Sequence, residues 1–288
     1  MLAASCSSGS DQAEEPVGPA ADGRNVSADD VVWQVFRGTS DYSAASLAQE
    51  VPDLTIYGDG RAFVADATVT AGPRGLDVGS VAADDLAAFI TTAQDSGLLE
   101  PGVDYGATDR SDLPLTTVVL ADGSIPLTAA VVGLSAEGLD LTADQQEARD
   151  GLAALVAESL RLVADAEPWV PDRLRAVWIA PDAEPEIDAA GAQPWPGPGF
   201  AEFPAPDDFS GTSCLLLGEA DGPDVWAAAL DNPGATWTEQ DELRQIVVAP
   251  VLPGEEGCPH SHDDEGDTTG GEGGGFVDPS TVDPPTEN

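Results

Sequence analysis

The stretch PDLTIYGDGRAFVAD, residues 52–66, decides the fold class of this chain. Apolar and polar residues alternate on both sides of Asp59-Gly60, a dipeptide typical of the tight type I′ turn, in which both central residues adopt a positive φ. The stretch therefore predicts two antiparallel strands joined in a hairpin. Tyr57 and Phe63 fall one in each strand, where aromatic side chains commonly pack across the pair.

A helix is expected after this hairpin. The segment SVAADDLAAFITTAQDSGLL, residues 80–99, opens on Ser80 as N-cap and has Gly97 as a stop signal. A strand over residues 31–36, VVWQVF, precedes the hairpin. Apolar residues at helical spacing predict a core-facing stripe on the helix, formed by Leu86, Phe89, Ile90 and Ala93.

The same order of elements then recurs. Residues 113–133, LPLTTVVLADGSIPLTAAVVG, predict a second hairpin across the Asp-Gly pair at 122–123. Residues 141–166 predict a longer helix, in which Thr142 and Gln145 form a capping box. Its apolar face is expected to contain Leu152, Leu155, Val156, Leu160 and Val163. The pattern indicates an α+β fold, an antiparallel sheet of hairpins with helices packed on one face.

A third block predicts a C-terminal β-α-β unit. Strands are expected in RLRAVWIAP and ELRQIVVAPVLPGEEGC, and TSCLLLGEADGPDVWAAALDN between them predicts a strand followed by a short helix. A Pro-rich crossing, residues 182–208, connects the first two strands in extended form. Its Trp195, Phe200 and Phe203 either anchor a binding partner or pack on the chain's own domain, and the sequence leaves both interpretations open.

The N-terminal stretch LAASC, residues 2–6, looks like a bacterial lipobox. In that interpretation Cys6 carries a diacylglycerol and becomes the mature N-terminus, which requires signal-peptide residues upstream of Met1. The alternative is a chance run of small residues. Ser, Gly, Pro and acidic residues follow Cys6 as a flexible tether to residue 28. A lipid anchor would attach the protein to a membrane, because no run of about 18 apolar residues exists to span one.

The remaining two cysteines, Cys214 and Cys258, are expected to form a disulfide, because an exported chain enters an oxidising compartment. Two free buried thiols are the alternative. A bridge between them would tie together the outer strands of the β-α-β unit.

The charge balance excludes one class of partner. All ten basic residues are arginine, against 53 acidic residues, and the formal net charge is −43. Such a chain repels nucleic acids and anionic surfaces, while it concentrates cations nearby. Envelope proteins, glycans and divalent cations remain as possible partners.

The side chains available exclude most catalytic chemistry. Both histidines, His260 and His262, lie beyond the predicted strands, so a Ser-His-Asp or Cys-His arrangement has no base within the core. The chain has no lysine for a Schiff base. We therefore expect no enzyme, no catalytic residues and no cofactor. A glycoside hydrolase that uses two carboxylates and acts on cell-wall carbohydrate is the alternative.

The histidines allow one further interpretation. His260, His262 and Asp263 lie close together in CPHSHDDE, and imidazole and carboxylate groups can hold a divalent transition metal. A metal-binding lipoprotein is thus a second alternative function. A solvated polar tail is the competing interpretation, because zinc needs about four ligands held in place.

Several of these motifs together resemble a family of uncharacterised lipoproteins from GC-rich Gram-positive bacteria. The motifs are VVWQV, PDLTIYGDGRAFV, AQDSGLLEPGVDYGATDRSDLPLTTVVLADG, CLLLGEADGPDVWAAAL and VVAPVLPGEEGC, and they span residues 31–258. The resemblance implies pairing of Cys214 with Cys258 and a location on the outer face of the cell membrane. It assigns no activity. The chain departs from the family pattern at Ala249, where an arginine is expected.

Four regions follow from these patterns. Residues 1–28 are the lipobox and tether, 29–168 the hairpin-helix-hairpin-helix unit, 169–258 the disulfide-tied unit, and 259–288 a disordered, acidic, Gly-rich tail. The sequence thus predicts a lipid-anchored cell-envelope protein that binds a partner and is not an enzyme.

Overall fold

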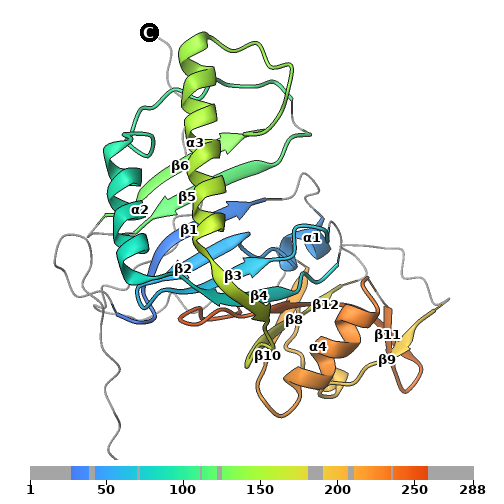
Figure 1. Cartoon of the computed structure of the whole chain (residues 1–288). Helices are drawn as coiled ribbons and strands as arrows, with labels where there is room; N and C mark the ends of the chain where they lie inside the picture. Colours follow the sequence, from blue (N-terminus) through green and yellow to red (C-terminus); the bar gives the residue numbers. More distant parts are fainter. Residues whose placement is uncertain are drawn as a thin grey trace, which may run out of the picture. The chain divides into compact units, whose positions relative to one another are not determined.

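The computed structural model of the chain describes residues 27–38, 43–69, 72–110, 112–121, 125–180, 191–206, 211–234 and 236–258. The chain divides into one compact unit, Met1–Cys258, and a second unit, Pro259–Asn288, which lies outside the described residues. The compact unit is an α+β fold with a large antiparallel sheet, four α-helices among its described residues, and a disulfide (Figure 1). At this level the predicted fold class is confirmed.

The first sheet has seven strands in the order β6-β5-β1-β2-β3-β4-β7, and every neighbouring pair is antiparallel. Its strands are β1 (Val31–Arg37), β2 (Leu54–Tyr57), β3 (Arg61–Ala65), β4 (Leu76–Ser80), β5 (Leu115–Leu120), β6 (Leu127–Val132) and β7 (Ala164–Pro168). Both predicted hairpins are present in it, as β2-β3 and β5-β6.

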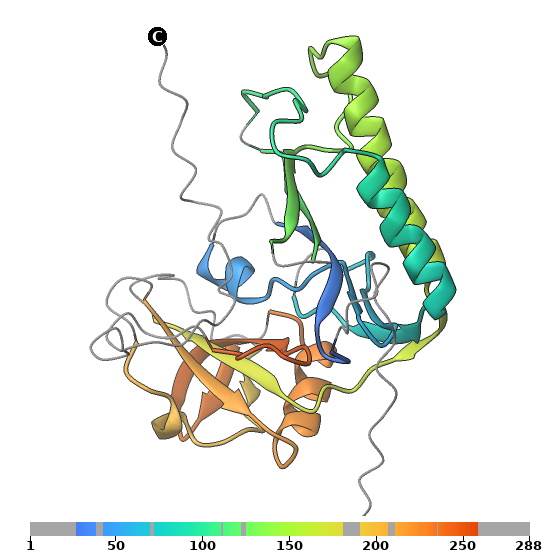
Figure 2. The same ribbon diagram turned by 90° about the vertical axis from the view of Figure 1, so that its left-hand side faces the viewer.

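Helices α2 (Ala83–Asp95) and α3 (Ala143–Leu162) lie on the same face of this sheet (Figures 1 and 2). The predicted stripe on α2 is confirmed, since Leu86, Phe89, Ile90 and Ala93 are all buried. The capping box on α3 is also present, because Thr142 and Gln145 exchange both hydrogen bonds. On the predicted face of α3, Leu152, Leu155 and Val156 are buried and Val163 packs against the core, whereas Leu160 is exposed.

Four local predictions are wrong. Ser80 is the last residue of β4, and the N-cap of α2 is Ala82, which has no side-chain cap bond. The 59–60 turn is a three-residue loop, 58–60, in which Gly60 alone has a positive φ. The predicted end of α3 is the third error, because β7 leaves the helix and pairs with β4. The closing strand is the fourth, since it ends at Pro250 and does not continue to Cys258.

The second sheet has five strands in the order β10-β8-β12-β11-β9. They are β8 (Leu174–Ile179), β9 (Gln193–Pro194), β10 (Thr212–Leu217), β11 (Thr236–Glu239) and β12 (Glu242–Pro250). Strands β10 and β12 both run antiparallel to β8, which lies between them, so they are parallel to each other. Helix α4 (Gly222–Asp231) lies between them in sequence. The short helix α1 (Ala44–Ala48) contacts β8 and β12.

Candidate functional site

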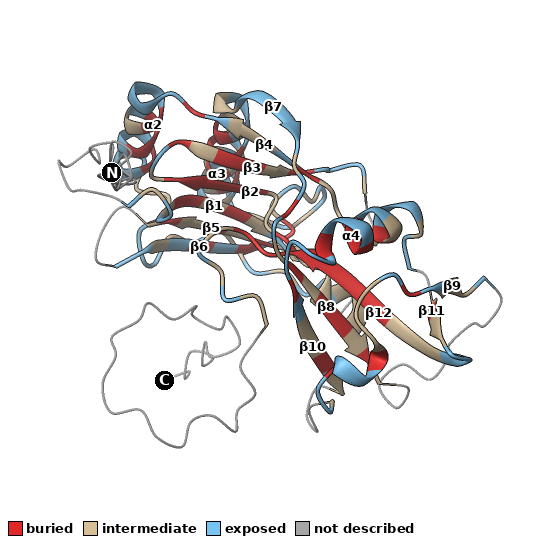
Figure 3. Ribbon diagram, turned by 90° about the horizontal axis from the view of Figure 1, so that it is seen from below, coloured by how far each residue is buried: buried red, intermediate tan, exposed pale blue. Residues whose placement is uncertain are grey.

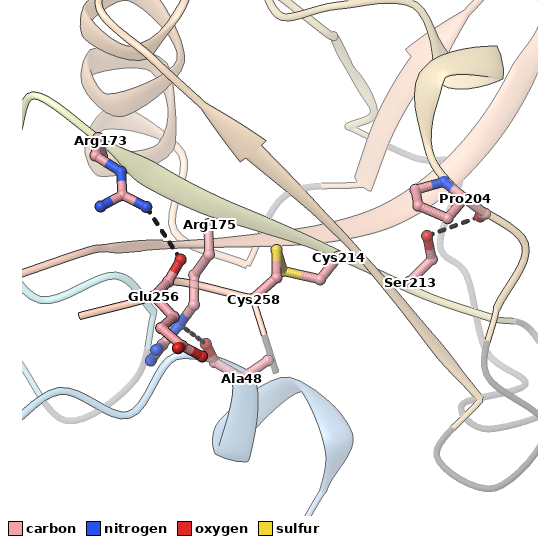
Figure 4. Close-up of a disulfide and its surroundings, with 8 residues drawn as sticks. All are labelled: Ala48, Arg173, Arg175, Pro204, Ser213, Cys214, Glu256 and Cys258. Carbon is pink, nitrogen blue, oxygen red and sulfur yellow. Dashed lines mark hydrogen bonds between the residues drawn. A yellow bond between two sulfur atoms is a disulfide. The ribbon is translucent and has the colours of Figure 1, made fainter. Parts of the chain in front are cut away.

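The disulfide joins the two cysteines that the sequence pairs. Cys214 lies on β10, and Cys258 lies beyond the end of β12, 44 residues later, with their Cα atoms 5.7 Å apart (Figure 4). The bond fixes the end of residues 251–258, which we call the C-terminal strap, to the edge of the second sheet. Disulfides of this kind persist in oxidising compartments.

The C-terminal strap also contacts the first sheet. Leu252 packs in a buried cluster with Tyr57 and Phe63, which belong to β2 and β3. The Tyr57 hydroxyl donates a hydrogen bond of 2.9 Å to the carbonyl of Pro253. The strap therefore links residues of both sheets, although it is irregular in structure.

Charged side chains surround the strap. Arg173 donates to the backbone carbonyls of Glu255 and Glu256, at 3.1 and 3.0 Å. Arg175 donates to the carbonyl of Ala48 at 3.3 Å (Figure 4) and to that of Glu50. The two guanidinium groups therefore supply hydrogen-bond donors to backbone carbonyls at the end of α1 and in the strap. At these places no helix or strand continues that would supply a backbone donor.

Glu255 is the carboxyl group in this cluster whose pKa departs from its ordinary value. Burial raises the pKa of Glu255, while the hydrogen bond from the Leu252 N–H, at 3.1 Å, and the charges of Arg175 and Arg173 lower it. Burial also lowers the pKa of Arg175. A carboxyl of raised pKa can act as a general acid, but Glu255 faces arginines and the backbone of its own strap. The arrangement is that of a structural clamp.

The three aromatic residues of the Pro-rich crossing lie in the core of the second sheet. Trp195, Phe200 and Phe203 are 9, 2 and 7 % exposed. The guanidinium of Arg244 lies 3.8 Å from the ring centroid of Trp178 and 4.8 Å from that of Phe200, and it donates to the Phe200 carbonyl. In this structure a partner does not reach these rings unless the crossing moves away, so their role as anchors stays a prediction.

One small cavity lies beside α1, α4 and the β11-β12 pair. It is lined by Ala45, Gln49, Pro73, Ala229, Asn232, Gly234, Trp237, Gln245, Ile246, Val247 and Val248. Its volume of about 60 Å³ holds a few water molecules. The lining contains no charged side chain.

The first sheet has a second face that carries no charge over three of its strands. The residues that alternate with the buried ones on β1, β5 and β6 point away from α2 and α3, as the strand register shows. We call this set the charge-free face; it consists of Gln34, Phe36, Leu115, Thr117, Val119, Thr128, Ala130 and Val132. All eight are partly or fully exposed in the described structure. Charged residues make up 22 % of the whole chain, and none occurs among these eight positions.

The remaining predicted site residues, Cys6, His260, His262 and Asp263, lie outside the described residues. Within the described part, no cluster of three or more histidine, cysteine or acidic residues could hold a metal ion. No helix in that part is both long and apolar enough to cross a membrane.

Sequence reasoning missed two features, Arg149 and the charge-free face. Arg149 is a residue of α3 whose side chain is only 2 % exposed. Arg149 lies three residues before Leu152 and seven before Val156, so helical spacing places it on the buried side of α3. This spacing was the only feature of the sequence that could have indicated its burial. The sequence showed the charge-free face only as three charge-poor strand segments, and it did not show that these segments lie side by side.

Comparison of the chain with protein-family models, with curated proteins and with solved structures finds no match.

Proposed function

We propose that this chain is a lipid-anchored protein on the outer face of a Gram-positive cell membrane, and that its folded part is a non-enzymatic interaction module. The observation that carries the location is the disulfide between Cys214 and Cys258. Such bonds are rare in reducing compartments, so the disulfide supports export. The LAASC stretch then supplies the expected acceptor of the lipid at Cys6.

The charge-free face supports an interaction role. An uncharged, partly apolar surface on an otherwise acidic protein is typical of a binding surface, because charged residues are depleted from the centres of interfaces. Its side chains are small or medium-sized, uncharged and, at Phe36, aromatic. A sheet face of this kind fits another protein better than it fits a small ligand, since it offers area and no enclosed volume.

The anchor is tested in the host. The protein is expressed from its genomic locus, with the upstream sequence included, and fed a radiolabelled fatty acid. We expect label in a membrane-bound protein, loss of label in Cys6→Ala, and no alkylation of Cys214 or Cys258 before reduction. An unlabelled, soluble wild-type protein with reduced cysteines would overturn the proposed location.

The interaction role is tested by photo-crosslinking in the same cells. A photoreactive amino acid replaces Val119 on the charge-free face or, as control, Ala154 on the exposed side of α3. We expect protein adducts from Val119 and none from Ala154. Equal or absent crosslinking at both positions would contradict the proposed interaction surface, whatever the outcome for the anchor.

A further inference from the structure

Strand β6 ends the first sheet and pairs only with β5 among the described strands (Figure 3). The Gly133 N–H donates to the Pro114 carbonyl at 2.8 Å, which sets the phase of the antiparallel ladder. Opposite residues in such a ladder alternate between bonded and non-bonded pairs. Thr128, Ala130 and Val132 therefore direct their backbone N–H and C=O groups away from β5.

These outward backbone groups are largely unpaired. The Val132 carbonyl accepts a hydrogen bond of 3.1 Å from Arg149. In the described part of the chain the backbone groups of Thr128 and Ala130 have no protein partner. Proline at position 126 has no N–H to offer, so the run of available groups starts at Thr128.

Proteins usually protect such an edge, and this sheet protects its other end more fully than β6, where Pro126 and the hydrogen bond from Arg149 limit only the two ends of the strand. Edge strands are commonly blunted by charged side chains, proline or backbone irregularity. At the far end, β7 carries the exposed acids Asp165 and Glu167, and Asp165 has a φ of 53°. Strand β6 reads LTAAVV, with no charge, proline or bulge. The contrast indicates that the β6 edge is kept available for pairing.

The unpaired backbone groups of the β6 edge determine which kind of partner can bind there. A row of alternating backbone donors and acceptors is complementary to another extended polypeptide. The strand presents no carboxylate to attract a basic peptide. A second copy of this acidic chain, however, can approach with least repulsion along a strand that has no charge.

The sequence of β6 is also self-complementary. In an antiparallel pair related by a two-fold axis at Ala130, outward residues meet outward residues. Ala130 then faces Ala130 of the second copy, and Thr128 faces Val132. The small Ala130 side chains meet on the two-fold axis. On either side of the axis the β-branched Thr128 and Val132 form a cross-strand pair, which is favourable in an antiparallel sheet.

We propose that two copies of this chain dimerise by pairing their β6 strands antiparallel about Ala130, so that two seven-stranded sheets become continuous. The inference deepens the proposed function and rests on it, because anchoring to one membrane raises the local concentration of the chain. The interface is isologous, and it extends the charge-free faces of both copies into one surface.

The register is tested with Ala130→Cys in the full chain in host membranes under mild oxidation. Cα atoms about 5.5 Å apart in a bonded antiparallel pair allow a disulfide. We expect a covalent homodimer from this variant and not from Ala154→Cys, a position on α3 that is also exposed. A covalent dimer no more abundant for Ala130→Cys than for the control would overturn the proposed register.

The dimer itself is tested by sedimentation of the full chain with Cys6→Ser, which prevents acylation. We expect self-association that strengthens with added salt and weakens at least tenfold in Ala130→Glu but not in Ala154→Glu. A protein that stays monomeric at all concentrations, with no homodimer in membranes, would overturn the inference. If Val119 then crosslinked only to other proteins, the proposed function would stand while the dimer failed.

Discussion

Arg149 is a buried cation whose hydrogen-bond acceptors are all backbone carbonyls. Its guanidinium donates to Tyr105 at 2.6 Å, Gly133 at 2.8 Å, Val132 at 3.1 Å and Gly106 at 3.3 Å. These carbonyls belong to loops and to the end of β6, where regular ladders stop. A single side chain thus connects α3 to the loops on either side of the β5-β6 hairpin.

We expect Arg149→Met to lower the free energy of unfolding by about 3 kcal/mol or more, because several buried carbonyls lose their donors. Urea denaturation followed by circular dichroism measures the change. Arg161→Met is the matched control on the same helix, since Arg161 is exposed and pairs only with Glu158 in the described structure. We expect it to cost under about 0.5 kcal/mol. Similar losses for both variants would contradict this role of Arg149.

Glu255 is expected to make stability depend on pH. Its pKa is raised in the folded protein, so the folded state binds more protons than the unfolded state above the ordinary carboxyl pKa of about 4.3. Stability therefore falls as the pH rises from that value through the folded pKa. Glu255→Gln removes this titration, and its stability relative to wild type should rise with pH over the same interval.

Urea titrations at several pH values between 4 and 8 measure this difference. Glu256→Gln is the reference for the loss of one negative charge, because it lies next in the strap and its side chain is exposed. The change measured for Glu256→Gln is subtracted from the change measured for Glu255→Gln at each pH. If the remaining difference from wild type stays constant or falls as the pH rises, burial does not raise the pKa of Glu255.

Among the elements, the β2-β3 turn shows how a short segment fixes a larger arrangement. Gly60 has a φ of 87°, and its carbonyl accepts a hydrogen bond of 2.8 Å from the Val81 N–H. A Cβ at this position would lie 2.4 Å from the Val81 carbonyl oxygen. The turn is therefore held against the residue that follows β4, which explains why only glycine fits there.

We expect Gly60→Ala to destabilise the protein more than Gly97→Ala does. Both glycines have a positive φ, but a Cβ on Gly97 meets no atom within 4 Å in the described structure. The Gly97 variant should show backbone strain alone, about 1–2 kcal/mol. The Gly60 variant should add the cost of displacing Val81. Equal losses in thermal or urea unfolding would mean that the turn moves without resistance.

At the scale of the whole molecule, the C-terminal strap and its disulfide join the second sheet to residues of the first. The strap contains little regular structure, and it stays in place through Cys258, Pro253, Glu255 and Leu252. We expect the double variant Cys214→Ala/Cys258→Ala to lose about 4 kcal/mol of stability, from the entropy of a 44-residue loop. Urea unfolding of the exported, non-acylated protein measures this loss.

Reductant provides the control for this prediction. It should destabilise the wild type to the level of the double variant and leave the double variant unchanged. A loss below about 1 kcal/mol, or a double variant that still responds to reductant, would show that the cross-link does not stabilise the fold.

Local sequence patterns determined much of the secondary structure of this protein and which faces of its elements are buried. The two hairpins, the α2 stripe and the Thr142–Gln145 capping box were predictable because their partners are a few residues apart or alternate along one strand. The disulfide was predictable from the small number of cysteines. The exact turn at 58–60 was not, because its conformation also depends on the hydrogen bond to Val81.

Only the tertiary structure decided which strands lie side by side and which surfaces remain open. It added β4 and β7 to the sheet, buried Arg149 and Phe200, and left β6 as a largely unpaired edge with no charge. The physical reason is that a sequence pattern specifies which face of an element is apolar, but not which distant element covers it. That choice depends on the burial and hydrogen bonding of the whole chain, and the candidate interaction surface arises from it.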